Sequence, residues 1–115
     1  MIRVLLVDDR ADFRGAMASL LDGQPDIEVV AQAGSLADAR LKLGGVDVAL
    51  LDRGLPDGDG LELVGELRGA NPGARVFVIS STAETLHPTD AIEAGADGII
   101  DKMDTPAGVF AAIRG

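Results

Sequence analysis

Short apolar segments alternate with segments of helical periodicity five times along the chain, and this alternation restricts the fold more than any other feature of the sequence. The apolar segments, the last of them the weakest, cover residues 2–7, 27–33, 46–51, 74–80 and 97–101. Nearly continuous apolar strands are typical of a parallel sheet, because helices cover both of its faces. Only residues 27–33 are interrupted by polar residues, Glu28 and Gln32, as in a partly exposed edge strand. We therefore expect one α/β domain, a (βα)5 doubly wound parallel sheet.

Helix signals mark the segments between the strands. Four of the predicted helices cover residues 12–23, 35–45, 59–71 and 104–115. Ser35, Asp59 and Thr105 are candidate N-caps, since their side-chain oxygens can accept a hydrogen bond from the first turn. Pro106 suits the first helical position, where a missing N–H costs nothing.

Pro88 restricts the remaining helix, which precedes the fifth strand. Proline is tolerated in the first turn of a helix but breaks its interior. This helix is therefore expected to begin near His87 or Pro88 and to end at Gly95. We interpret His87, the only histidine, as a surface residue at the start of this helix.

The composition excludes several classes of function. The formal net charge is −9, and such a surface repels phosphate backbones, so we expect no direct nucleic-acid binding by this domain. The chain has no cysteine, hence neither a disulfide nor a thiolate metal site. No apolar run reaches the roughly 18 residues of a membrane span. Acidic residues follow the first strand too soon for a signal peptide, so we expect a cytoplasmic protein without membrane association.

Polar residues follow four of the five predicted strands, where open parallel sheets bind their ligands. In chain order they are Asp8 and Asp9, Asp52, Ser80, and Lys102. Each residue alone has an ordinary explanation as a helix cap, a turn residue or a solvated side chain. Together they predict that three carboxylates, a hydroxyl and an ammonium converge at one edge of the sheet.

Three neighbouring carboxylates require a compensating cation. Mg²⁺ prefers a few oxygen ligands together with water and phosphate oxygens. The formal charges balance, since the three carboxylates contribute −3 while Mg²⁺ and Lys102 contribute +3. In such a setting Asp52 could act as a nucleophile and form an acyl phosphate.

At these residues the chain resembles the receiver domain of bacterial two-component response regulators. The resemblance covers essentially all 115 residues and rests on "LLVDD", "LLDRGLPDGDGLEL", Ser80 and "GADGIIDK". The separations 80 − 52 = 28 and 102 − 52 = 50, and the stretch "QPDIEVVAQAGS", resemble receivers that precede a LuxR-type helix-turn-helix domain. The resemblance implies a flavodoxin-like strand order 2-1-3-4-5.

The resemblance also implies the metal ligands. Asp9 would bind Mg²⁺ directly and Asp8 largely through water, while Asp52 and the backbone carbonyl of Gly54 would complete the shell.

For the phosphoryl group, the resemblance implies that Asp52 is the phosphoacceptor, Ser80 the switch hydroxyl and Lys102 the phosphate-binding lysine. The phosphodonor would be a sensor histidine kinase, and the domain would catalyse only its own phosphorylation and dephosphorylation. A homodimer on phosphorylation and a DNA-binding output domain beyond residue 115, controlling transcription, are further expectations.

The sequence departs from the receiver pattern at three positions. Ile99 stands where receivers usually carry Tyr or Phe, Pro88 shortens the fourth helix, and Met103 replaces a frequent proline. Because Ile99 is stiff and small, we expect activation to rearrange residues 81–88 rather than Ile99.

Two other functions remain open at this point. An aspartate-nucleophile phosphatase would place a second aspartate two residues after Asp52, where this chain has Gly54. A pseudo-receiver that only binds partners would lack site residues, whereas the predicted set is complete.

Overall fold

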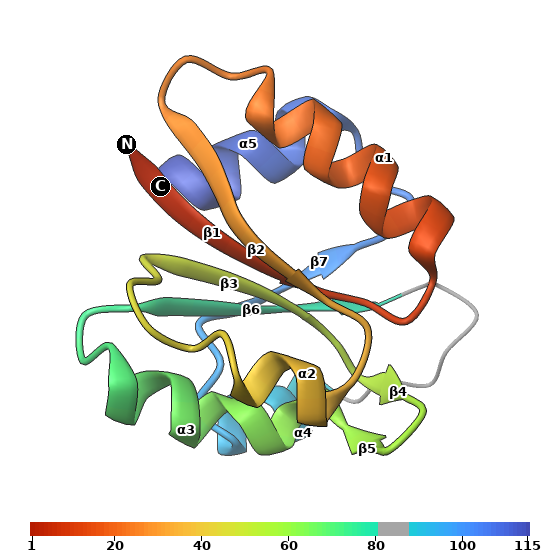
Figure 1. Cartoon of the computed structure of the whole chain (residues 1–115), viewed down its shortest axis with the longest axis vertical. Helices are drawn as coiled ribbons and strands as arrows, with labels where there is room; N and C mark the ends of the chain where they lie inside the picture. Colours follow the sequence, from red (N-terminus) through yellow and green to blue (C-terminus); the bar gives the residue numbers. More distant parts are fainter. Residues whose placement is uncertain (81–87) are drawn as a thin grey trace.

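A computed structural model describes residues 1–80 and 88–115 of the chain. Within these residues five parallel strands form one sheet in the order β2-β1-β3-β6-β7, with helices on both faces (Figure 1). The strands are β1 (Ile2–Val7), β2 (Ile27–Ala33), β3 (Val48–Asp52), β6 (Arg75–Ser80) and β7 (Gly98–Asp101). The helices are α1 (Ala11–Asp22), α2 (Leu36–Arg40), α3 (Leu63–Ala70), α4 (Pro88–Glu93) and α5 (Pro106–Arg114). The predicted fold class and strand order are confirmed.

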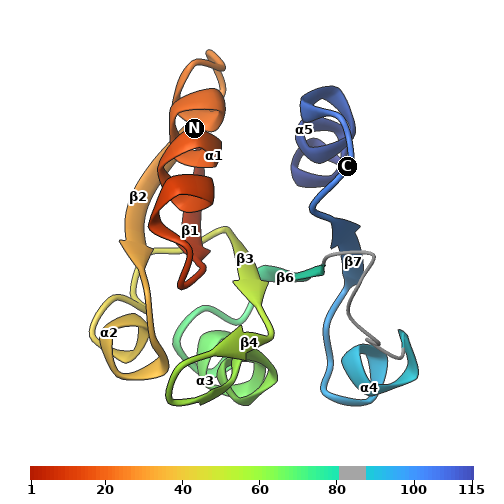
Figure 2. The same cartoon turned by 90° about the vertical axis from the view of Figure 1, so that its right-hand side faces the viewer.

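Helices α1 and α5 lie on one face of the sheet and α2, α3 and α4 on the other (Figure 2). Each face buries a core of its own. Successive side chains of a strand point to opposite faces, so Leu5 and Val7 pack toward α2 and α3, whereas Val4 and Leu6 pack toward α1 and α5. All five residues of β3 are buried, as expected of a central strand. The edge strand β2 is buried only at its two ends and is exposed at Glu28 and Gln32, the polar residues that predicted a partly exposed strand.

The capping predictions hold at α2 and α5. The Ser35 side chain accepts a hydrogen bond from the Asp38 N–H, and the Thr105 side chain accepts one from the Gly108 N–H. Pro106 is the first residue of α5. The described part of α4 begins at Pro88, while His87 and the rest of residues 81–87 lie outside the described residues.

Helix α2 is shorter than the sequence predicted. The periodicity favoured a helix over residues 35–45, but α2 ends at Arg40. Leu41 follows with 84% of its surface exposed, so extending the helix would bury no apolar side chain there. Gly45 then has a φ of 71°, a left-handed conformation that a helix does not contain.

The segment between β3 and α3 holds structure that the sequence did not predict. Strands β4 (Gly54–Leu55) and β5 (Gly58–Asp59) form a small antiparallel hairpin, and a 3₁₀ turn covers Gly60–Glu62. Asp59 caps this turn rather than α3 itself, and its own N–H donates to the Glu62 carboxylate at 3.1 Å. None of the helices among the described residues is long and apolar enough to cross a membrane.

Gly60 is required by a close approach of two backbone segments. A Cβ atom at this position would lie 2.0 Å from the carbonyl oxygen of Asp52. We expect Gly60→Ala to lower the free energy of unfolding by about 2–3 kcal/mol, because neither backbone segment can yield cheaply. Urea denaturation measures this change.

Gly65→Ala is the matched control, since nothing lies within 4 Å of a Cβ atom at that exposed position in α3. It is expected to raise the free energy of unfolding by about 0.5–1 kcal/mol, because alanine favours the helix. Equal stabilities of the two variants would contradict the packing argument at Gly60.

Candidate functional site

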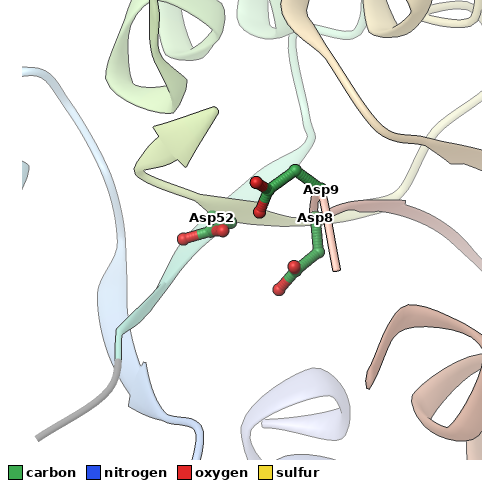
Figure 3. A group of neighbouring side chains, drawn as sticks. All are labelled: Asp8, Asp9 and Asp52. Atoms are coloured by element: carbon green, nitrogen blue, oxygen red, sulfur yellow. The ribbon is translucent and has the colours of Figure 1, made fainter. Parts of the chain in front are cut away.

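Three aspartates meet at the carboxyl edge of the sheet (Figure 3). Asp8 and Asp9 follow β1, and Asp52 is the last residue of β3, the strand that pairs with β1. One carboxylate oxygen from each lies within 4.8 Å of the others. Asp8 and Asp52 are buried, with 0% and 3% of their surface exposed, whereas Asp9 is exposed. The structure therefore brings together the three carboxylates that the sequence predicted.

Asp8 is the most enclosed of the three. Its Oδ1 accepts a hydrogen bond from the Arg10 N–H at 2.9 Å, and its Oδ2 lies 3.0 Å from the Lys102 ammonium. This second contact is an ion pair without hydrogen-bond geometry, and Oδ2 accepts no hydrogen bond from the described residues. The backbone of Asp8 is held as well, because its N–H donates to Ala33 and its carbonyl accepts from Arg14.

Lys102 bridges the two buried carboxylates. Its Nζ lies 3.0 Å from Asp8 and 3.6 Å from Asp52, and its side chain is 11% exposed. The Lys102 N–H donates to the Ser80 carbonyl at 2.8 Å, which joins the ends of β6 and β7. Ser80 is 9% exposed and aligns with Asp101 across these two strands. The predicted hydroxyl and ammonium therefore lie at the same edge as the carboxylates.

The segment after Asp52 is shaped by local contacts. The Gly54 N–H donates to Asp52 Oδ1 at 3.3 Å, and Gly54 is exposed at the start of the hairpin. Arg53 pairs with Asp59 across the hairpin at 2.7 Å. These contacts fix the backbone conformation of the turn that contains Gly54.

The site fits a divalent cation of the hard type. Its donors are all oxygens, which Mg²⁺ and Ca²⁺ prefer. The three carboxylates and Lys102 sum to a formal charge of −3 + 1 = −2. The buried Asp8 Oδ2 accepts no hydrogen bond from the described residues, but it lies 3.0 Å from the Lys102 ammonium, so a metal ion bound there would replace or share this ion pair.

Asp57 joins the hairpin to α2 although the two are distant in sequence. Its carboxylate accepts hydrogen bonds from the N–H groups of Leu36 and Ala37 at 2.8 and 3.0 Å. These two hydrogen bonds lower the pKa of Asp57 below that of an ordinary aspartate, because they stabilise the ionised carboxylate. No local sequence pattern indicates these contacts, because the two partners lie 21 and 20 residues away along the chain.

Two further residues near the cluster were not predicted. Phe13 lies in the first turn of α1, and its ring lies beside the Lys102 ammonium. Arg14, the next residue, donates to the Asp8 carbonyl. Local sequence does not reveal these roles, because the groups that the two residues contact lie outside α1.

Known proteins share both this sequence pattern and this fold. A sequence profile described as the response regulator receiver domain matches residues 4–114. The DNA-binding transcriptional activator DevR/DosR of Mycobacterium tuberculosis is 40% identical over an alignment of 104 residues, which covers 89% of this chain and 48% of that protein. This chain spans about half the length of the curated relatives that it matches.

Two crystal structures illustrate the likeness of the fold. A LuxR-family two-component response regulator from Aurantimonas has a TM-score of 0.84 at 29% identity, over 97% of this chain and 81% of that one. A response regulator from Burkholderia pseudomallei has a TM-score of 0.86 at 26% identity, over 98% of this chain and 66% of that one. The second structure contains a phosphorylated aspartic acid, a calcium ion and citrate.

Removing the Lys102 ammonium should destabilise the fold, because the repulsion among the carboxylates is then no longer compensated. We expect Lys102→Met to lower the free energy of unfolding by about 3 kcal/mol in the presence of EDTA, since a buried charge loses its partner. Added Mg²⁺ should stabilise this variant more than the wild type, because the cation no longer competes with an ammonium. Urea denaturation in EDTA and in MgCl₂ tests both statements, and equal stability of the two proteins in EDTA would contradict them.

The hydrogen bonds from the first turn of α2 to the Asp57 carboxylate should make the stability of the fold depend on pH. The folded state lowers the pKa of Asp57, so its stabilising effect is present above the pKa of the unfolded chain and is lost as the pH falls through the folded value. We expect Asp57→Asn to have a lower melting temperature than the wild type at pH 7, with the difference vanishing in acid.

Glu93→Gln, at an exposed position of α4, controls for the removal of one negative charge from an acidic protein. If the melting temperatures of Asp57→Asn and the wild type differ by the same amount at pH 7 and at pH 2.5, the ionised Asp57 carboxylate does not stabilise the start of α2.

Proposed function

Because the chain belongs to the family of response regulator receiver domains, we propose that it is a phosphorylation-dependent switch with Asp52 as its phosphoacceptor. The observation that carries this proposal is the burial of Asp52 beside Asp8, within 4.8 Å of Asp9 and within reach of Lys102. An ordinary structural aspartate would not need two further carboxylates at its side. The phosphorylated aspartic acid in the Burkholderia pseudomallei structure supports the same chemistry.

The phosphoryl group would come from a phosphohistidine of a sensor histidine kinase. A carboxylate oxygen of Asp52 attacks phosphorus as the phosphorus–nitrogen bond breaks, and the imidazole leaves and takes up a proton. The product is an acyl phosphate on Asp52. In this proposal the domain catalyses only this transfer and the later hydrolysis of the product.

Each residue of the cluster has a separate task in the proposal. Asp8, Asp9 and the Gly54 carbonyl would hold Mg²⁺ together with Asp52. The metal ion, when bound, would neutralise charge on the phosphoryl oxygens. Lys102 would shift its ammonium from the carboxylates to a phosphoryl oxygen, and the Ser80 hydroxyl would donate to another.

In this chain, the change at the phosphorylation site would have to reach the surface without the aromatic side chain that receivers usually carry at position 99. Ile99 lies on β7 and is 38% exposed, and its branched side chain cannot fill the space that a tyrosine would occupy. The rearrangement expected over residues 81–88 falls, apart from Pro88, outside the described residues. Hydrogen exchange with a beryllofluoride mimic is the direct test of where the surface changes.

For the whole protein, we propose transcriptional control through a DNA-binding output domain. The support is the relative DevR/DosR, a DNA-binding transcriptional activator, and the LuxR family of the Aurantimonas structure. Residues 1–115 would then form the cytoplasmic receiver domain, with phosphorylation promoting a homodimer. Reading the coding sequence downstream of residue 115 tests the presence of that domain.

Acetyl phosphate and Mg²⁺ should add one phosphoryl group to the wild-type chain and none to Asp52→Asn. The reason is that an amide cannot replace the carboxylate as a nucleophile. Intact-mass spectrometry measures the addition of about 80 Da. Asp101→Asn, at the end of β7, is the control and should be labelled as the wild type is. Labelling of Asp52→Asn to the wild-type extent would place the phosphoacceptor elsewhere.

A further inference from the structure

The ammonium of Lys102 lies between the buried carboxylates and an aromatic ring. Nζ is 3.0 Å from Asp8 and 3.6 Å from Asp52, and it is 5.1 Å from the centroid of the Phe13 ring. We propose that Phe13 is a positioning residue for phosphoryl transfer, which acts through a cation–π contact with Lys102. The inference deepens the proposed function and rests on it.

The contact joins two elements that are far apart in sequence. Phe13 lies in the first turn of α1 and packs against the core between the sheet and α1 and α5, so its backbone and ring are anchored. Lys102 follows β7 on a flexible four-carbon side chain that has several rotamers. Because the Lys102 side chain is only 11% exposed, little water separates the ammonium from its neighbours.

A ring has an advantage over a further carboxylate as the neighbour of this lysine. A carboxylate would compete with the phosphoryl oxygens for the ammonium, whereas a ring attracts the cation weakly and accepts no proton. Cation–π contacts of partly buried lysines correspond to a factor of about 2 to 30 in an equilibrium. The ring also excludes water from one side of the ammonium, which strengthens its attraction to an arriving phosphoryl group.

The first test compares Phe13→Leu with Phe13→Tyr. Leucine keeps an apolar side chain but has no π face, while tyrosine retains one. With acetyl phosphate at saturating Mg²⁺, we expect Phe13→Leu to phosphorylate about 3- to 10-fold more slowly than the wild type. Phe13→Tyr should stay within about twofold. Phe110→Leu is the matched control, because Phe110 packs against the same core but its ring faces Arg114 instead of the site.

A double-mutant cycle separates positioning from general packing. If Phe13 acts through Lys102, then Phe13→Leu should cause no further slowing in a Lys102→Met background. Equal slowing in both backgrounds, or no slowing in the wild-type background, would overturn the inference. If the wild type itself takes up no phosphoryl group, the proposed function fails and the inference falls with it, so the two failures are distinguishable.

Nuclear magnetic resonance supplies a readout that does not depend on activity. In the folded, unphosphorylated wild type, the ring current of Phe13 should shift the Lys102 ε-CH₂ signal away from those of exposed lysines. The shift should disappear in Phe13→Leu and persist in Phe13→Tyr and Phe110→Leu. A Lys102 signal unaffected by Phe13→Leu would show that the ring does not hold the ammonium.

Discussion

Burial of the Asp8 carboxylate at the edge of the sheet requires contacts from several parts of the chain. A carboxylate with no exposed surface is stable only when other groups compensate its charge. The compensation comes from the Arg10 N–H and from the Lys102 ammonium, which are separated by most of the sequence. The Asp8 backbone is held in turn by Ala33 and Arg14. Through its carboxylate and its backbone together, Asp8 thus links β1 to β2, to α1 and to the segment after β7.

Much of this arrangement could be predicted from the sequence, because it follows from the geometry of parallel sheets. Nearly continuous apolar strands imply that both faces are covered, and the carboxyl ends of such strands share one edge. The proximity of Asp8, Asp9 and Asp52 therefore needed no knowledge of individual contacts. The same holds for the caps Ser35 and Thr105, whose partners lie three residues away.

Features that depend on distant contacts could not be predicted in this way. The apolar pattern over residues 35–45 does not show that no core covers Leu41, where α2 ends. Asp57 looks like any turn aspartate until the fold places it at the N-terminus of α2. Phe13 has the spacing of a core residue and serves as one, and only the tertiary structure shows that Lys102 lies beside its ring. Local patterns thus determine the elements, while neighbouring elements determine where they end and what their side chains do.

The strand order has a consequence for synthesis on the ribosome. Within the five-stranded sheet, every strand after β1 pairs with at least one strand made before it: β2 and β3 with β1, β6 with β3, and β7 with β6. The sheet can therefore grow outward as the chain emerges, without waiting for a later strand to be inserted between two earlier ones. Lys102 is made last among the charged groups of the cluster, directly after β7. A nascent chain that ends before β7 therefore carries three carboxylates without the ammonium that pairs with two of them in the folded domain.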